Sequence, residues 1–272
     1  MVFPAAMKNF IKKIINFNLN SRPHSFIFTR LQKIDSDISD LFTYILGDYE
    51  TIFIAENNLA LLVGMPVDCS HIFHFYDNNG IFIRTYETNS QQFHFKLMIN
   101  EKITGGSKFG SFTHHVKYSN IFINKYEKLL TNTSFQHRGY TGYRKDLNNG
   151  FSYVHGNFGG MYISKNNTIK SLARNRGKHT YTPQLIIKPS HRYEFIFVNP
   201  TSKDSNIKFF LIEQNDVKVL KEICLTSHAS FKFTLDDFEV RHESNISWET
   251  NLPIARCITF EHIDKFFDVF HS

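Results

Sequence analysis

The chain has 272 residues, a mean hydropathy of −0.29 and a formal net charge of +6, with 29 Phe and 12 Tyr but a single Trp. This length buries a substantial core without disulfides or a structural metal, so the class of small domains that depend on such cross-links is excluded. The three cysteines form no C-x-x-C pair, and no apolar run approaches the ~20 residues of a transmembrane helix. We therefore expect a soluble, cytoplasmic protein without a transmembrane segment.

The first predicted element is a basic amphipathic helix at residues 7–17, within a basic N-terminal arm at residues 1–22. Apolar side chains recur there at helical spacing, and three lysines lie away from that stripe. In one interpretation the helix covers a sheet; in another it makes a peripheral contact with an anionic membrane surface. In a third interpretation the whole protein is an assembly or scaffold protein, which docks through this helix and carries a large exposed apolar patch.

Residues 23–145 are predicted to form a β-rich N-terminal lobe, because short runs of β-branched and aromatic residues are separated by turn residues. The dipeptide Asn79-Gly80 favours a tight hairpin turn. Apolar and polar residues alternate strictly around His94, which places its side chain on the exposed face of the strand. The predicted elements are a strand at 25–29, a helix at 37–46, paired strands at 50–55 and 59–65, paired strands at 71–76 and 81–86, and a strand at 92–99.

Residues 146–272 are predicted to form an antiparallel β-sandwich lobe, although the whole chain as one domain is the alternative. Evenly spaced short strands with turn-rich connections are typical of such folds, here as a meander. The predicted fold class is mainly β: an antiparallel β-sandwich of one or two lobes with a short amphipathic N-terminal helix. The predicted strands are 184–188, 193–198, 207–212, 217–223, 230–235, 253–260 and 266–270.

Residues 102–192 differ from the rest of the chain in charge and glycine content. They hold 15 Lys and Arg against two acids, and nine of the 13 glycines lie between residues 105 and 160. We expect this stretch to form loops that make a basic functional surface. The alternative is that basic and acidic segments only face each other across a domain interface.

Non-catalytic recognition of an anionic ligand is the first functional hypothesis. Guanidinium groups bind oxyanions in bidentate geometry, glycine-rich turns present backbone N–H groups, and aromatic rings stack on sugars or bases. The expected ligand or partner is a glycan or another phosphate- or carboxylate-bearing molecule, with nucleic acid less favoured. The candidate binding residues are Arg138, Arg144, Arg174, Arg176, Tyr140 and Asn157.

A metal-dependent hydrolase or oxygenase on a β scaffold is the second hypothesis, so whether the protein is an enzyme stays open. Three histidines from successive strands would hold a divalent metal ion and leave a position open for water. Neighbouring strand residues point to opposite faces, so at most one of His114 and His115 would take part. The spacing matches no diagnostic metal motif. The candidate ligands are His114, His115, His137 and His155.

Overall fold

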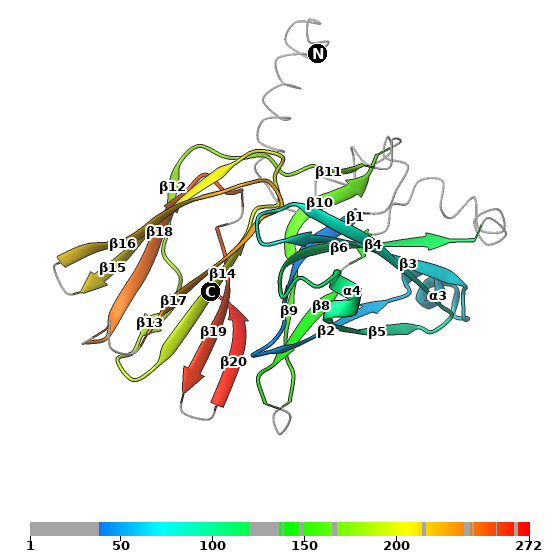
Figure 1. Ribbon diagram of the computed structural model, residues 1–272, viewed down its shortest axis with the longest axis horizontal. Helices are drawn as coiled ribbons and strands as arrows, with labels where there is room; N and C mark the ends of the chain where they lie inside the picture. The colour runs from blue at the N-terminus through cyan, green and yellow to red at the C-terminus, as the bar shows by residue number, and fades with distance from the viewer. Residues whose placement is uncertain are drawn as a thin grey trace, which may run out of the picture.

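The computed structural model shows a mainly β protein whose sheets pack as antiparallel sandwiches (Figure 1), which confirms the predicted fold class. The predicted N-terminal arm at 1–22 and the predicted strand at 25–29 lie outside the described residues. No helix in the described part of the chain is long and apolar enough to cross a membrane. The structure describes residues 38–119, 136–137, 139–146, 150–164, 168–213, 216–236, 240, 242–253, 255–263 and 266–272.

The first lobe consists of two sheets. Sheet A has the strand order β11-β10-β1-β6-β3-β4, and the short strand β7 runs parallel to β1. Sheet B has the order β5-β2-β8-β9. The bounds in sheet A are β1 Ile38–Ile45, β3 Cys69–Asp77, β4 Phe82–Ser90, β6 Phe109–Tyr118, β7 Gln136–His137, β10 Asn157–Ile163 and β11 Ile169–Ser171. Those in sheet B are β2 Glu50–Glu56, β5 His94–Ile99, β8 Tyr140–Arg144 and β9 Ser152–His155, and two short helices, α3 Asn58–Val63 and α4 Glu101–Thr104, complete the lobe.

Phenylalanine rings fill the space between sheets A and B. Phe53 of β2 is fully buried, and its ring centroid lies 5.0 Å from that of Phe42, 5.5 Å from that of Phe73 and 5.4 Å from that of Phe112. These three partners belong to β1, β3 and β6 of the facing sheet. Each buried aromatic ring removes a large apolar area from water. Some of the many Phe residues of the sequence thus join the two sheets of this lobe.

The second lobe consists of sheet C, with the order β12-β18-β15-β16 and β13 beside β18, and sheet D, with the order β17-β14-β19-β20. The buried Trp248 of sheet C lies 5.1 Å from Phe197 of sheet D, between ring centroids. The bounds in sheet C are β12 His179–Tyr181, β13 Ile186–Ile187, β15 Ser205–Glu213, β16 Asp216–Leu225 and β18 Ser244–Thr250. Those in sheet D are β14 Arg192–Val198, β17 Ser230–Leu235, β19 Ile258–Ile263 and β20 Phe266–His271.

Each strand predicted in the last third of the chain overlaps an observed strand, although the one predicted at 253–260 begins only at Ile258 and the one predicted at 184–188 covers only Ile186–Ile187. These strands do not form a meander. Consecutive strands such as β14 and β15 belong to opposite sheets, so the chain crosses repeatedly between sheets C and D. The central strand β18 was not predicted at all. Its polar residues hide the strand pattern, although five of its seven residues are buried.

Two predicted elements have the wrong type. The helix predicted at 37–46 is strand β1, in which all eight residues are buried. A strand buried on both faces shows no polar alternation, so periodicity cannot separate it from a buried helix. The strand predicted at 59–65 is instead helix α3. Asn57 caps its start by accepting a hydrogen bond from the backbone N–H of Ala60 (3.1 Å), and Gly64 ends it in the left-handed conformation.

The glycine-rich stretch forms mainly strands rather than the expected loops. Strands β6, β8, β9 and β10 all lie within it. A Cβ atom on Gly110 would overlap the carbonyl oxygen of Tyr76 on the neighbouring strand β3, so glycine permits a close approach of backbone there. Strands β9, β10 and β11 pair within the first lobe. The strand pairing changes from sheet A to sheet C between Ser171 and His179.

The two lobes share a third apolar cluster. The outer face of sheet D packs against the first lobe, where the ring of Phe260 lies 5.2 Å from that of Tyr49 and 4.9 Å from that of Tyr143. The hydroxyl of Tyr49 also lies 3.2 Å from Nε2 of His262. Strand β20 runs beside β9 across this contact (Figure 1). The lobes are therefore packed together, and ionisable groups lie in the contact between them.

A second contact between the lobes joins two turns. The turn after β3 contains the predicted Asn79-Gly80, and its hairpin with β4 confirms the prediction. The hydroxyl of Thr226 donates to the carbonyl of Asn79 (2.7 Å), and the backbone N–H of Ser230 donates to the carbonyl of Asn78 (3.1 Å). Thr226 lies in the segment that joins β16 to β17, and Ser230 begins β17. This turn therefore closes its own hairpin and also holds the second lobe.

We expect Gly80→Ala to lower the free energy of unfolding by about 2–5 kcal/mol. Gly80 has a φ of +80°, and an added Cβ would overlap the carbonyl oxygen of Ser227 and lie 2.7 Å from the backbone nitrogen of Ala229. The matched control is Gly64→Ala, because Gly64 has a φ of +70° with no atom near the added Cβ. That variant should lose only about 1–2 kcal/mol, the cost of the left-handed conformation. Equal losses in urea denaturation would show that the contact between turns contributes nothing.

Candidate functional site

The outer face of sheet B carries two exposed tyrosines. Tyr140 lies opposite Ile54 and His155, and Gly142 lies opposite Ile52 and Tyr153. Directly paired residues share a face, so both tyrosines project from the same side of the sheet, as diagonal neighbours on adjacent strands. Tyr140 is 48% exposed and Tyr153 is 45% exposed. We call this surface the tyrosine face, and it consists of Ile52, Ile54, Met98, Tyr140 and Tyr153.

Gly142 explains how Tyr153 lies on this face. A Cβ atom at Gly142 would be 2.5 Å from Cε1 of Tyr153 and 2.8 Å from Cγ2 of Ile52. The ring of Tyr153 therefore occupies the space above the glycine, next to Ile52. Any larger residue at position 142 would push the ring away from the sheet. The result is an aromatic surface laid on a rigid sheet, with a phenolic hydroxyl as its polar group.

Charged groups border the tyrosine face. Nε of Arg144 donates to Oε2 of Glu50 (2.6 Å), and the guanidinium carbon lies 4.4 Å from the ring centroid of Phe151. The ring of Phe151 lies in turn 6.2 Å from that of Tyr153. Arg144, predicted to bind an anion, is thus already paired with a carboxylate and an aromatic ring. The exposed Lys96, opposite Ile54, is a second cation on this face.

A polar cleft of about 1000 Å³ adjoins the tyrosine face at the edge strand β5. His94 and Lys96 belong to both surfaces, because they line the cleft and project from the same side of β5 as Met98. His94 is exposed, as its alternating strand predicted, and lies 3.9 Å from the carboxylate of Glu56. The cleft offers amide and hydroxyl groups that both donate and accept hydrogen bonds. Its polar lining includes Ser70, Asn89, Ser90, Gln91 and Gln92.

The five predicted binding residues that the structure describes do not come together. Only Tyr140 and Arg144 lie on sheet B. Asn157 is 5% exposed within sheet A, and Arg138 lies outside the described residues. Arg174 and Arg176 are exposed in the segment between β11 and β12. Sequence reasoning missed Tyr153, although its alternation with Phe151 and His155 was the available signal.

Histidines 114 and 115 are both buried and point to opposite faces of β6, as strand geometry predicts. Nε2 of His114 lies 2.8 Å from Nδ1 of His71, whereas the ring of His115 lies 5.6 Å from that of His74. His155 belongs to sheet B.

The ring of His155 lies 4.4 Å from that of His271 at the contact between the lobes. The side chain of His137 is not among those described. Within the described part of the chain, no group of three or more His, Cys, Asp or Glu residues is arranged to hold a metal ion. The three-histidine site therefore stays a prediction that no described geometry supports.

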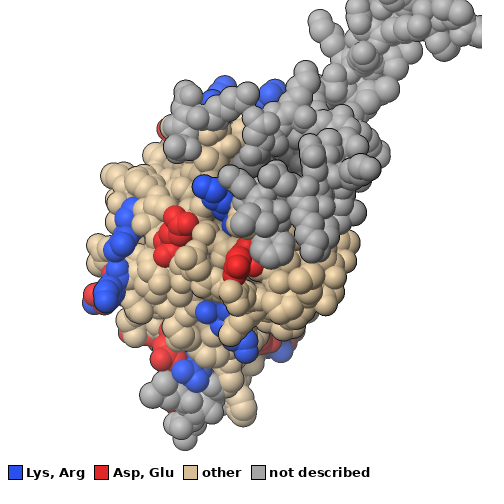
Figure 2. Space-filling view, turned by 90° about the vertical axis from the view of Figure 1, so that its right-hand side faces the viewer, with Lys and Arg blue, Asp and Glu red and all other residues tan. Residues whose placement is uncertain are grey.

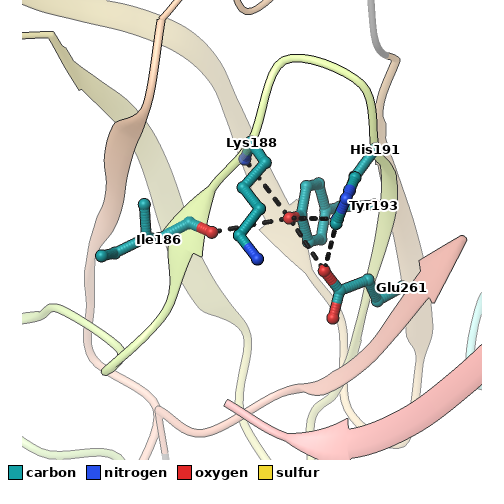
Figure 3. A network of polar contacts seen from close by, with 5 residues as sticks. All are labelled: Ile186, Lys188, His191, Tyr193 and Glu261. Atoms are coloured by element: carbon teal, nitrogen blue, oxygen red, sulfur yellow. Dashed lines mark hydrogen bonds and ion pairs between the residues drawn. The ribbon is translucent and has the colours of Figure 1, made fainter. Parts of the chain in front are cut away.

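Another cluster of ionisable groups lies in the second lobe, where its side chains bind one another (Figure 3). Nδ1 of His191 lies 2.7 Å from Oε1 of Glu261, and the hydroxyl of Tyr193 donates to the same oxygen at 3.0 Å. Burial raises the pKa of Tyr193, so its hydroxyl stays protonated and can donate. The backbone N–H of Lys188 donates to that hydroxyl (3.3 Å). Because these groups bind one another, the cluster connects the turn before β14 to β19.

The charge segregation of the sequence produces no single basic surface on the side shown in Figure 2. Lys and Arg are interspersed there with Asp and Glu, and most of the described surface carries neither. Ion pairs join the basic stretch to acids outside it. Lys178 pairs with Glu249, and Nη2 of Arg192 lies 2.8 Å from the buried Glu194. Both ion pairs lie within the second lobe, so opposite charges meet there locally, and the predicted pairing of charges across a domain interface stays a prediction.

No protein-family model matches this chain, and no curated protein matches it. Among the solved structures that match, two show the following weak likeness. One holds the M60 catalytic domain with the CBM51-1 and CBM51-2 domains of ZmpB from Clostridium perfringens, with 8% identity, a TM-score of 0.18, and coverage of 78% of this chain and 31% of that chain. A second is infectious bursal disease virus, Gx strain, with 8% identity, a TM-score of 0.16, and coverage of 86% and 55%. This chain spans less than two thirds of either, and TM-scores this low carry no argument about function.

Proposed function

We propose that this protein recognises an acidic glycan, without catalysis, through the tyrosine face and the adjoining cleft. The observation that carries the proposal is the pair of half-exposed tyrosines, Tyr140 and Tyr153, on one face of a rigid sheet. Exposed aromatic rings gathered on one surface mark binding sites more often than isolated ones do. Sugar rings present C–H groups on one side, which pack on an aromatic ring, and hydroxyl groups around their rim.

The surroundings of the tyrosines suit the remaining groups of such a ligand. Amides of Asn89 and Gln92 in the cleft would bind sugar hydroxyls, because each amide both donates and accepts. Lys96 lies where the tyrosine face meets the cleft, so its ammonium group would pair with a carboxylate or sulfate on the sugar. A sheet surface changes little on binding, which keeps the entropic cost of association low.

We expect Tyr153→Ala and Tyr140→Ala each to weaken binding of acidic glycans by about tenfold or more, as for aromatic residues at the centre of an interface. The test is a panel of acidic and neutral oligosaccharides, screened first on an array and then measured by isothermal titration calorimetry. Phe82→Ala is the matched control, because Phe82 is a 51% exposed aromatic residue on β4 of sheet A, the sheet opposite the tyrosine face. It should bind as the unchanged protein does.

The charge of the ligand is tested separately with Lys96→Gln. This variant should lose affinity for the acidic sugars and keep its affinity for matched neutral sugars, and the loss should shrink as salt is added. Binding that survives both tyrosine substitutions would place the ligand elsewhere. A protein that binds no sugar of the panel would overturn the proposed function.

A further inference from the structure

The outer face of sheet C carries apolar side chains that nothing in the described structure covers. Sheet C lies at the end of the molecule away from the first lobe (Figure 1). Val217 is 58% exposed, Val219 is 52% exposed and Ile186 is 53% exposed. The opposite side of the same sheet packs into the core of the second lobe through residues such as Phe209 and Trp248.

The strand register places these apolar side chains in one band. Val219 lies opposite Phe210, and Val217 lies opposite Ile212. Across the next strand, Asn245 lies opposite both Ile212 and Ile186. Paired residues share a face, so the side chains form a continuous surface across four strands. We call it the apolar band, and it consists of Ile186, Phe210, Ile212, Val217 and Val219.

A row of charges with alternating sign runs beside the apolar band. Lys208 lies opposite Glu222 on one side and Glu249 on the other. Its Nζ is 3.7 Å from Oε2 of Glu222. Lys178, the residue before β12, forms an ion pair with Glu249. Reading across the sheet from β16 to β12, the charges are therefore negative, positive, negative and positive.

We propose that a second copy of this chain docks on the outer face of sheet C, with a twofold axis parallel to the strands. Rotation about such an axis places β16 over β13 and β15 over β18 of the second copy, so that Val217 and Val219 meet Ile186, and Phe210 and Ile212 meet Ser247 and Asn245. It also reverses the order of the charge row. Each charge then faces the opposite charge of the other copy.

In this arrangement Glu222 faces Lys178 of the second copy, and Lys208 faces Glu249 of the second copy. A row of one sign, or one with unequal ends, would not match itself in this way. The acids in the row also disfavour an anionic lipid surface as the occupant. Face-to-face packing of two sheets with nearly aligned strands is the usual geometry of β-sandwiches.

The test is the dependence of molar mass on concentration, measured by sedimentation velocity on the full chain over a roughly hundredfold range. We expect a reversible dimer. Lys208→Glu would create like-charge contacts with Glu249 across the axis, and we expect it to weaken the dimer about tenfold or more. The swap Lys208→Glu with Glu249→Lys restores opposite charges across the axis, so it should recover most of the lost affinity.

Two further measurements test the proposed dimer independently. Val219→Lys alters an exposed residue, so the fold should persist while the dimer dissociates. Cys224 lies on the same outer face as Lys208, and the other two cysteines are buried, so the unmodified chain accepts one thiol-directed spin label. Dimerisation should then produce a single distance between labels. A chain that stays monomeric throughout, or a charge swap that binds no better than Lys208→Glu, would overturn the proposal.

Discussion

Acidification from about pH 7 to about pH 5 is expected to lower the free energy of unfolding by several kcal/mol. Three histidines at the contact between the lobes are responsible. Burial lowers the pKa of His228, His262 and His271 to about 4 in each case. For His262 the neighbouring Glu194 opposes this effect, and the cations Lys145, Arg192 and Lys232 add to it.

The direction of this change in stability follows from comparing the folded and the unfolded state. In the unfolded chain these histidines have an ordinary pKa of about 6.5, so between about pH 6.5 and pH 4 the unfolded state binds more protons. Stability therefore falls as the pH falls through that window and levels off below about pH 4. One pH unit corresponds to about 1.4 kcal/mol for each group, so each histidine contributes about 2 kcal/mol of loss at pH 5.

The position of these histidines indicates what acid would disturb first. The ring of His228 lies 4.9 Å from that of Tyr76, and Nε2 of His271 lies 2.9 Å from the carbonyl oxygen of His155. Both contacts, like that of His262 with Tyr49, join one lobe to the other. Charging these rings would place buried cations in the contact, and of the three only His262 has a described carboxylate close by, that of Glu194 at 3.7 Å. We therefore expect the lobes to separate before either unfolds.

Urea denaturation at a series of pH values measures this effect. The single tryptophan, Trp248, reports the second lobe by fluorescence, and circular dichroism reports both lobes. His262→Gln should flatten the pH dependence, because it removes one of the titrating groups. Phe266→Ala is the control, since it removes an exposed side chain without an ionisable group and should leave the slope unchanged. A stability that is constant between pH 7 and pH 5 would contradict the assignment.

Trp248→Ala is expected to cost about 3–5 kcal/mol of folding free energy, which is typical when a large buried aromatic side chain is truncated. Trp248 is fully buried in sheet C, and its Nε1 donates to the carbonyl oxygen of Ala255 at 2.8 Å. Its ring lies 5.1 Å from that of Phe197 and 5.3 Å from that of Tyr181. The substitution would leave a cavity between sheets C and D and an unpaired carbonyl group.

Two further variants separate the cavity from the lost hydrogen bond. Trp248→Phe keeps most of the ring contacts and loses the Nε1 donor, so it should cost less than Trp248→Ala. Phe266→Ala removes an exposed ring and should change stability by less than about 0.5 kcal/mol. Thermal and urea unfolding followed by circular dichroism would compare all three. A loss for Trp248→Ala as small as that for Phe266→Ala would show that sheets C and D are not held together by this residue.

The sequence predicted those strands that carry a local signal. The hairpin of β3 and β4 was predicted because Asn79-Gly80 favours its turn, and the exposure of His94 followed from strict alternation. Strand β1 has no alternation because both of its faces are buried, so the same reasoning produced a helix. Strand β18 lies in the middle of its sheet, yet its Ser, Asn and Glu residues resemble a turn.

The candidate site was only partly accessible to sequence reasoning. Tyr140 and Arg144 were selected for their residue types, and both lie on sheet B. The register that brings Tyr153 above Gly142 depends on the pairing of β8 with β9, and no local pattern in the sequence predicts that pairing. The pairing of Arg144 with Glu50 depends on a contact between distant strands. Charge counted along the chain therefore overstated the charge that the folded protein presents.

The place of β1 in sheet A has a consequence for how the protein is made. This strand is among the first described segments to leave the ribosome, yet its neighbours β6 and β10 follow much later in the chain. Such distant pairing slows folding, because a long loop must close before its contacts form. Until Asn157–Ile163 have been synthesised, Ile38–Ile45, which is fully buried in the folded protein, has an unpaired edge open to other chains. The nascent protein should therefore depend on chaperones during this interval, and its yield should rise when translation is slowed at low temperature.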